Sequence, residues 1–107
     1  MARFLSLWRI SPSAPWPTDP TENAKVYETM FAAIDNLLET GEMLEFGFFQ
    51  GATSGYVIST GDAKDSFRRA FSFYPFLEVE GREILSYETG KEVMRGVLKD
   101  KVEAMKR

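Results

Sequence analysis

The order of strand-like and helix-like patterns constrains this 107-residue chain more than any other feature of its sequence. Short apolar runs, which are typical of strands, alternate with segments whose apolar residues recur at helical spacing. The resulting order is strand, helix, strand, strand, helix, strand, with one more helix at the end. The strands are predicted at 3–10, 43–49, 53–60 and 76–80, the last continuing less regularly to 87.

Capping residues mark the ends of the first predicted helix. Four of the five prolines lie in SPSAPWPTDP, residues 11–20, where they end the first strand. Asp19 precedes Pro20, and Glu22 stands where its side chain can complete a capping box, so a helix is predicted to begin there. Gly41 is the residue type that ends helices in the left-handed conformation.

Two further helices are predicted in the same way. Asp62 is predicted to cap a helix that runs to about Phe73, with an apolar face made of Ala63, Phe67, Ala70 and Phe71. Thr89 and Glu92 form the pattern of a capping box and open a third helix. The apolar seam of this helix consists of Val93, Met94, Val97, Leu98, Val102 and Met105. We expect it to pack against its own domain or a partner rather than on a membrane surface.

A chain of this length forms one domain with one core. The order of elements therefore predicts an α+β, ferredoxin-like βαββαβ fold, with an antiparallel sheet and two helices on one of its faces. The single domain covers residues 1–107, divided into a core of 1–88 and an appended C-terminal helix of 89–107.

The hairpin between the second and third strands sets the predicted faces of the sheet. A loop of residues 50–52 would place Phe49 opposite Thr53. The helices would then cover Leu44, Phe46, Phe48, Tyr56 and Ile58. The other face would carry Phe4, Ser6, Trp8, Ile10, Met43, Glu45, Gly47, Phe49, Thr53, Val57, Ser59, Phe76, Glu78 and Glu80.

This second face is too apolar to remain in water. We expect either the sheet of a second copy or the third helix to cover it. Polar and small residues among the rings predict a cavity there.

Composition excludes several classes of function. The chain contains neither cysteine nor histidine, so disulfides, thiolate or histidine metal sites and every mechanism built on Ser-His or Cys-His are excluded. We expect no cofactor and no metal. The formal net charge of −3 and the absence of a basic stripe argue against nucleic acid as a partner. No stretch approaches the ~20 apolar residues of a membrane span, so a soluble, cytoplasmic protein is expected.

Two segments resemble a known superfamily. The break Tyr74-Pro75-Phe76 before an acidic last strand, and the strand Gly55-Tyr56-Val57-Ile58 ahead of the second helix, are similar to those of the dimeric α/β-barrel superfamily, particularly muconolactone isomerase-like proteins and their small relatives. The resemblance is best over residues 53–88.

The resemblance implies a homodimer or larger closed ring, with any site between sheet and helices. Members include cofactor-independent isomerases and monooxygenases, haem-degrading enzymes and proteins with no assigned activity. The absence of histidine argues against the haem-degrading members. No catalytic motif matches residue by residue.

Glu45 is the candidate catalytic residue. Among Met43, Phe49 and Trp8 its carboxyl would be desolvated, which raises a carboxyl pKa and makes it a usable general base for isomerisation of a lactone or keto acid. The competing interpretation is an ion pair with Arg3 or Arg9. Glu78 and Glu80 have the spacing of paired acids, but on an edge strand we interpret them as charges that block unwanted strand pairing.

The candidate ligand-binding residues are Ser6, Trp8, Trp16 and Phe49. The two tryptophans could hold a flat ligand, with the loop around Trp16 as a lid; a tryptophan among prolines also packs over a barrel mouth.

Three functions remain open: binding of a small, mostly apolar ligand between the sheet and a partner, a cofactor-free isomerase or monooxygenase that uses Glu45, and a structural assembly module. Arg68 and Arg69 could meet a carboxylate or phosphate, but we interpret them as part of a solvated helix face.

Overall fold

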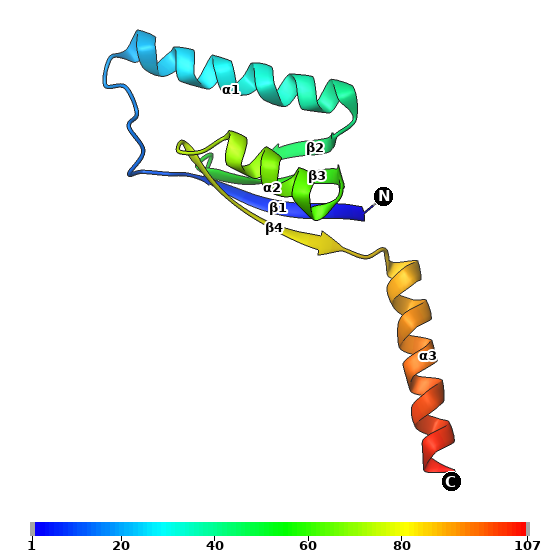
Figure 1. The fold of residues 1–107 in the computed structure, drawn as a ribbon. Coiled ribbons are helices and arrows are strands. Elements are labelled where there is room, and N and C mark those ends of the chain that lie inside the picture. The colour runs from blue at the N-terminus through cyan, green and yellow to red at the C-terminus, as the bar shows by residue number, and fades with distance from the viewer. Residues whose placement is uncertain (1, 107) are drawn as a thin grey trace.

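The computed structural model describes residues 2–106 and forms an α+β domain with a four-stranded antiparallel sheet and three helices (Figure 1). The elements are β1 (Ala2–Ile10), α1 (Pro20–Thr40), β2 (Met43–Phe48), β3 (Ser54–Gly61), α2 (Ala63–Ser72), β4 (Leu77–Ile84) and α3 (Tyr87–Met105). The strands lie side by side in the order β2-β3-β1-β4. The order of elements along the chain and the order of strands in the sheet are both compatible with the predicted ferredoxin-like arrangement. The α+β class is confirmed.

The caps of α1 and α2 are the predicted residues, whereas the cap of α3 is a different residue. A side-chain oxygen of Asp19 accepts from the backbone N–H of Glu22 at 3.1 Å. The side chain of Glu22 bonds Lys25 instead of reaching back, so this box is half formed. Asp62 and Asp65 do form a complete capping box on α2. The cap of α3 is Ser86, not Thr89, because the Ser86 hydroxyl accepts from the Thr89 N–H at 3.1 Å.

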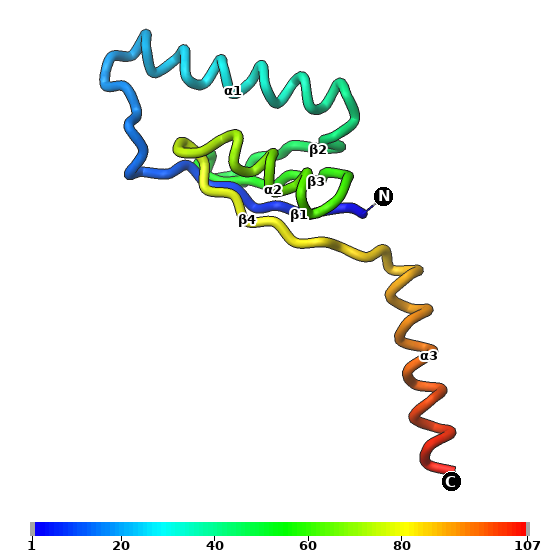
Figure 2. Tube along the Cα trace, in the orientation of Figure 1, coloured from blue at the N-terminus to red at the C-terminus, as the bar shows by residue number. Residues whose placement is uncertain are grey.

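Helices α1 and α2 cover one face of the sheet, which we call the helix face (Figure 2). The buried strand residues on this face include Phe4, Ser6, Trp8, Met43, Val57, Ser59 and Leu77. Ile34 from α1 and Phe73 next to α2 complete the core cluster with the strand side chains. The core therefore lies between the sheet and two helices that each contact it separately.

The predicted faces are correct for most of β2 and for Glu78 and Glu80 of β4, but they are reversed for β1 and β3. The reversal of β3 against β2 arises because the hairpin is one residue longer than expected. Phe48 pairs with Gly55, and the N–H of Phe49 donates to the carbonyl of Ser54 at 2.8 Å. The loop is thus residues 50–53, with Ala52 at a φ of 65°. A one-residue change of register turns every side chain of a strand to the opposite face.

A β-bulge in β2 changes a second time which residues share a face of the sheet. The register shifts between Met43, which pairs with Ser59, and Glu45, which pairs with Ile58. Met43 and Glu45, predicted to share a face, therefore lie on opposite faces. Trp8 and Ser6 lie on the helix face with Met43, while Glu45 and Phe49 lie on the other.

The second face of the sheet, which we call the open face, is apolar as predicted, but with different residues. Cross-strand pairs Leu5–Ile58 and Leu7–Tyr56 lie at its centre, and the ring of Phe49 is 6.1 Å from that of Tyr56. Leu7 and Phe49 are 49% and 46% exposed. Over residues 2–106 nothing covers this face.

Helix α3 does not fold across the open face. It leaves the end of β4 and extends away from the sheet on the side opposite α1 (Figure 1), which gives the chain a longest dimension of 72 Å. All nineteen of its residues lie in the described part of the chain, and none of them is buried. Within residues 2–106, no helix has both the length and the hydropathy that crossing a membrane requires.

Candidate ligand-binding site

Trp8 lies at the centre of the helix face. Its indole stacks on Phe46 with the ring centroids 5.3 Å apart and meets the edge of Phe48 at 5.4 Å. The indole N–H donates to the carbonyl of Gly47 at 3.2 Å. A Cβ on Gly55, the residue paired with Trp8, would lie 2.5 Å from the indole, so only glycine leaves room for this ring.

Small cavities lie on both sides of Trp8. The cavity on the α2 side has a volume of about 30 Å³ and is lined by Ser6, Trp8, Val57, Ser59, Ser66 and Arg69, among others. The cavity on the α1 side, about 70 Å³, is bounded by Trp8, Tyr27, Met30 and Phe46 and others. A groove of about 280 Å³ between α1 and the end of α2 includes Met30 and Phe73. The apolar residues of the helix face thus border a set of neighbouring spaces.

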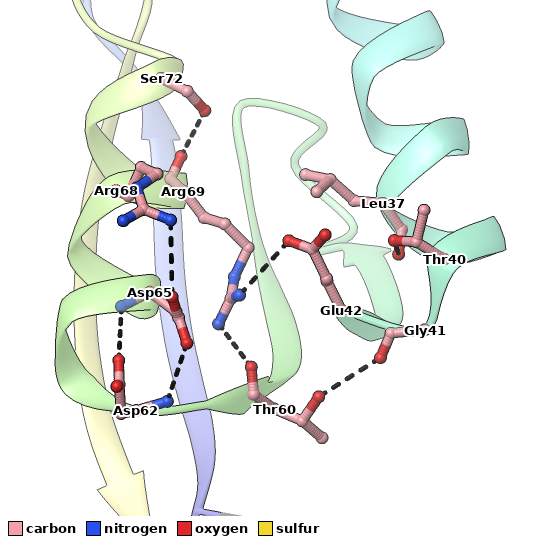
Figure 3. Close-up of polar contacts among 10 residues, drawn as sticks. All are labelled: Leu37, Thr40, Gly41, Glu42, Thr60, Asp62, Asp65, Arg68, Arg69 and Ser72. Carbon is pink, nitrogen blue, oxygen red and sulfur yellow. Dashed lines mark hydrogen bonds and ion pairs between the residues drawn. The ribbon is translucent and has the colours of Figure 1, made fainter.

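Arg69 supplies the positive charge of this region. The residue is only 9% exposed, and Figure 3 shows its side chain reaching from α2 toward β3 and Glu42. Its Nη2 donates to the carbonyl of Thr60 at 2.8 Å, while Nη1 lies 3.7 Å from a carboxylate oxygen of Glu42. A guanidinium has five N–H donors, so these two partners use only part of its capacity.

Three serines line the α2-side cavity together with Arg69. Ser6 and Ser59 are buried on the helix face, and Ser66 lies on α2. A Cβ on Gly81 would come within 2.9 Å of the Ser6 hydroxyl and 3.4 Å of the Ser66 hydroxyl, so glycine leaves room beside both hydroxyls. Hydroxyls and a guanidinium beside apolar walls suit the carboxylate of a largely apolar molecule.

Sequence reasoning missed Arg69. The side of α2 that faces the sheet carries Ser66, Arg69, Ala70 and Phe73, while Arg68 is exposed and pairs with Asp65 at 3.5 Å. The interpretation of both arginines as a solvated face is therefore correct for Arg68 and wrong for Arg69. The available signal was the one-turn spacing of Ser66, Arg69, Ala70 and Phe73, which places them on one side of the helix.

Glu45 and Phe49 lie on the open face, whereas Ser6 and Trp8 lie on the helix face. The predicted cavity is thus divided in a single chain: Trp8 lines one cavity with Ser6 and another, of about 400 Å³, with Phe49. Glu45 is exposed rather than desolvated, and the Tyr56 hydroxyl donates to its carboxylate. That hydrogen bond, with some desolvation and the nearby negative charge, raises the pKa of Tyr56 above its ordinary value.

In the part of the chain that the structure describes, neither predicted alternative partner, Arg3 or Arg9, forms an ion pair with Glu45. Arg9 pairs with Glu78, directly opposite it across β1 and β4. Glu80 pairs with Arg82 at 3.3 Å. Both glutamates lie on the edge strand β4, where the sequence analysis placed them. No ion pair within residues 2–106 involves Glu45.

Trp16 holds the loop that follows β1. Its ring stacks on Tyr27 of α1 at 5.2 Å and lies 4.7 Å from Phe76, and its indole N–H donates to the carbonyl of Ser11 at 2.7 Å. Trp16 and Trp8 therefore each stack on an aromatic ring of their own chain. The structure does not bring them together as two sides of one ligand clamp.

Comparison of the chain with protein-family models and with curated proteins finds no match to either.

Proposed function

We propose that this protein binds a small, mostly apolar anion between the helix face of its sheet and helices α1 and α2, and that it does so as a dimer. The observation that carries the proposal is Arg69, a buried cation that faces the cavity beside Trp8. The supposed ligand is flat enough to lie against the aromatic rings and carries one carboxylate or similar group.

The surroundings of Arg69 support an anionic ligand. Removing a charged side chain from water costs several kcal/mol unless partners satisfy it. Within the chain the negative partner is Glu42, whose side chain is 54% exposed and 3.7 Å away. A ligand carboxylate could accept two parallel N–H donors of the guanidinium, which is the stronger arrangement.

The spaces around Trp8 support a ligand that enters between the helices. On the helix face, those next to Trp8 hold about 30 and 70 Å³, while the groove between the helices holds about 280 Å³. Ligand pockets have volumes of roughly 300 Å³ and above. Binding therefore requires α1 and α2 to separate slightly, which is feasible because each packs on the sheet through its own contacts.

The dimer is supported by the open face. Its five apolar residues lie next to one another on β1, on β3 and just after the end of β2: Leu5, Leu7, Tyr56, Ile58 and Phe49. Such patches mark interaction sites. Two copies that place their open faces together would cover both patches with one two-fold contact, as in a dimeric α/β barrel.

The geometry favours binding over the isomerase or monooxygenase that would use Glu45. Glu45 and its partner Tyr56 lie on the open face, and neither lines the cavity that contains Arg69. In the proposed dimer they would lie at the subunit contact. A purely structural assembly module would explain the open face but would not require a cavity beside Arg69, whose bonds to Thr60 and Glu42 leave donors unused.

The test uses two probes of the same shape, 2-naphthoate and the neutral 2-naphthalenemethanol. We expect 2-naphthoate to bind saturably, with NMR shifts at the Trp8 indole N–H and in the Arg69 side chain. Arg69→Gln should weaken 2-naphthoate roughly 10- to 100-fold, because a hydrogen bond to a charged group contributes about 1.5–3 kcal/mol. The alcohol should bind weakly and equally to both proteins.

Arg68→Gln is the matched control, since it removes the same charge from the adjacent, exposed position. Equal losses of 2-naphthoate affinity in the two variants would mean that only net charge matters. Shifts confined to Phe49 and Leu7 would place binding on the open face. Either result would contradict the proposed site.

A further inference from the structure

Helix α2 and the turn after it carry three aromatic residues on the outside of the domain. Phe67, Phe71 and Tyr74 are 74%, 63% and 68% exposed, although an amphipathic helix normally turns such residues toward its core. Their rings form a row, with centroids 6.3 Å apart between Phe67 and Phe71 and 5.4 Å apart between Phe71 and Tyr74. The inward position is given to Arg69 instead. Packing within a single chain does not account for the outward position of the three rings.

A groove runs beside this row. It has a volume of about 550 Å³ and is bounded by the aromatic row, by residues 13–15 of the loop after β1, and by Glu78 and Val79 at the start of β4. We call it the α2 groove. Its walls are more apolar than polar, and they include Phe67, Ala70 and Phe71 from successive turns of α2. It is therefore suited to a second apolar helix rather than to a compact polar molecule.

Helix α3 has the complementary surface. Its seam residues, Val93, Met94, Val97, Leu98, Val102 and Met105, are all at least half exposed. In proteins most of the stability of a helix comes from packing of its apolar face. Helix α3 therefore needs an apolar surface to pack against. Within one chain it does not lie on the open face of the sheet.

The direction and length of α3 show where that surface lies in the proposed dimer. Nineteen residues at 1.5 Å each make a helix of roughly 28 Å. Sheets that pack face to face lie about 10 Å apart, and a helix layer on the far side adds about another 10 Å. Since α3 leaves on the side opposite α1 (Figure 1), it would pass the edge of the partner's sheet and reach the partner's helix layer.

We infer that α3 of each copy packs its seam into the α2 groove of the other copy, so that two helices are exchanged across the dimer. This inference rests on the proposed face-to-face dimer. A stable interface buries about 800 Å² on each partner, whereas an exposed apolar patch such as the open face offers a few hundred. The exchanged helix supplies the remaining area and at the same time covers Phe67, Phe71 and Tyr74.

The absence of cysteine from the chain allows a direct test in the full-length protein. The variants Leu98→Cys and Phe71→Cys each change an exposed side chain, so both should fold normally. The two are mixed, exchanged by dilution and reconcentration, and treated with a short bismaleimide. We expect a covalent dimer that mass spectrometry assigns to positions 98 and 71, at least 10-fold above the yield from either variant alone.

Phe31→Cys on α1 is the matched control, because Phe31 is also an exposed ring on the helix layer. Equal or preferred cross-linking of position 98 to position 31, or of position 98 to itself, would overturn the α2 groove as the docking site. The doubly substituted chain adds a second check, since a cross-link within one chain would show that α3 folds back on its own domain.

Sedimentation of the wild-type chain separates the two proposals. A dimer at micromolar concentration that gives no 98–71 cross-link would refute the exchanged helix and leave the face-to-face dimer intact. A monomer would refute both.

Discussion

The two faces of the sheet are built from the same kinds of residue, yet they differ in what covers them. Trp8 and Val57 on the helix face are 4% and 8% exposed, while Leu7, next to Trp8 in the chain, is 49% exposed on the open face. Two crossover helices can cover only one face. The difference shows that a strand with apolar residues on both of its sides contributes to two separate surfaces. One surface is buried within the chain, and the other is available for association.

The largest effect should come from removing the side chain at the centre of the helix face. Trp8→Ala should lower the free energy of unfolding by about 3–5 kcal/mol, because it deletes a buried ring that stacks on Phe46. Urea denaturation followed by circular dichroism measures this loss. The loss should be the same at every protein concentration, since the cavity is created within one chain.

A charge at the centre of the open face should affect association instead. In Leu7→Lys the new ammonium lies opposite Glu80, so a single chain can accommodate it. In the proposed dimer the same group enters an apolar contact. We expect the dissociation constant of the dimer to rise by roughly 100-fold or more, as measured by sedimentation velocity.

Asn36→Lys, which adds the same charge to the exposed part of α1, is the control for this experiment. It should leave the dissociation constant unchanged. If Leu7→Lys sediments like Asn36→Lys, the open face is not an interface, and the contrast between the faces has no consequence for assembly.

The smallest effect concerns the pH dependence of the helix that covers the helix face. Hydrogen bonds from backbone N–H groups, chiefly that of Asp65, hold the pKa of Asp62 below its ordinary value of 3.8. A lowered folded-state pKa contributes stability that is present above pH 3.8 and is lost as the pH falls through the folded value. Asp62→Ala should therefore be less stable than wild type at pH 6, and the gap should narrow below about pH 4.

Asp62→Asn separates the charge from the cap. Asparagine still accepts the N–H of Asp65 but does not titrate, so this variant should keep its cap at low pH. Urea midpoints at several pH values provide the comparison. A gap between wild type and Asp62→Ala that stays constant from pH 6 to pH 2.5 would show that the carboxylate charge plays no part.

The sequence predicted the class of fold because the signals for it are local. Asp19 with Pro20, Gly41 and Asp62 each fix one helix end through a backbone hydrogen bond or a left-handed φ, and all three stand where the structure uses them. The bounds of the first three strands were also correct within one residue, and β4 ends at Ile84, within the less regular continuation predicted to residue 87. Such features depend on neighbours a few positions away, which a sequence displays directly.

The candidate site could not be predicted because it depends on register. The loop of residues 50–53 is one residue longer than the predicted loop of 50–52. Ala52 adopts the positive φ in this loop, and alanine is not a residue type that predicts this conformation. The longer loop places Glu45 on the opposite face from Trp8. The bulge after Met43 places Glu45 on the opposite face from Met43 as well. Arg69 was missed for a related reason, since aromatic rings were assumed to point inward and α2 turns them outward.

The bulge in β2 also limits how this protein can associate. β2 is one border of the sheet, and a bulge there bends the strand and interrupts the regular row of N–H and C=O groups that an added strand would need. The opposite border, β4, carries Glu78, Glu80, Arg82 and Glu83. Lateral polymerisation into longer sheets or fibrils is thus blocked at both ends, and chains that meet are directed to join through broad surfaces that close on themselves.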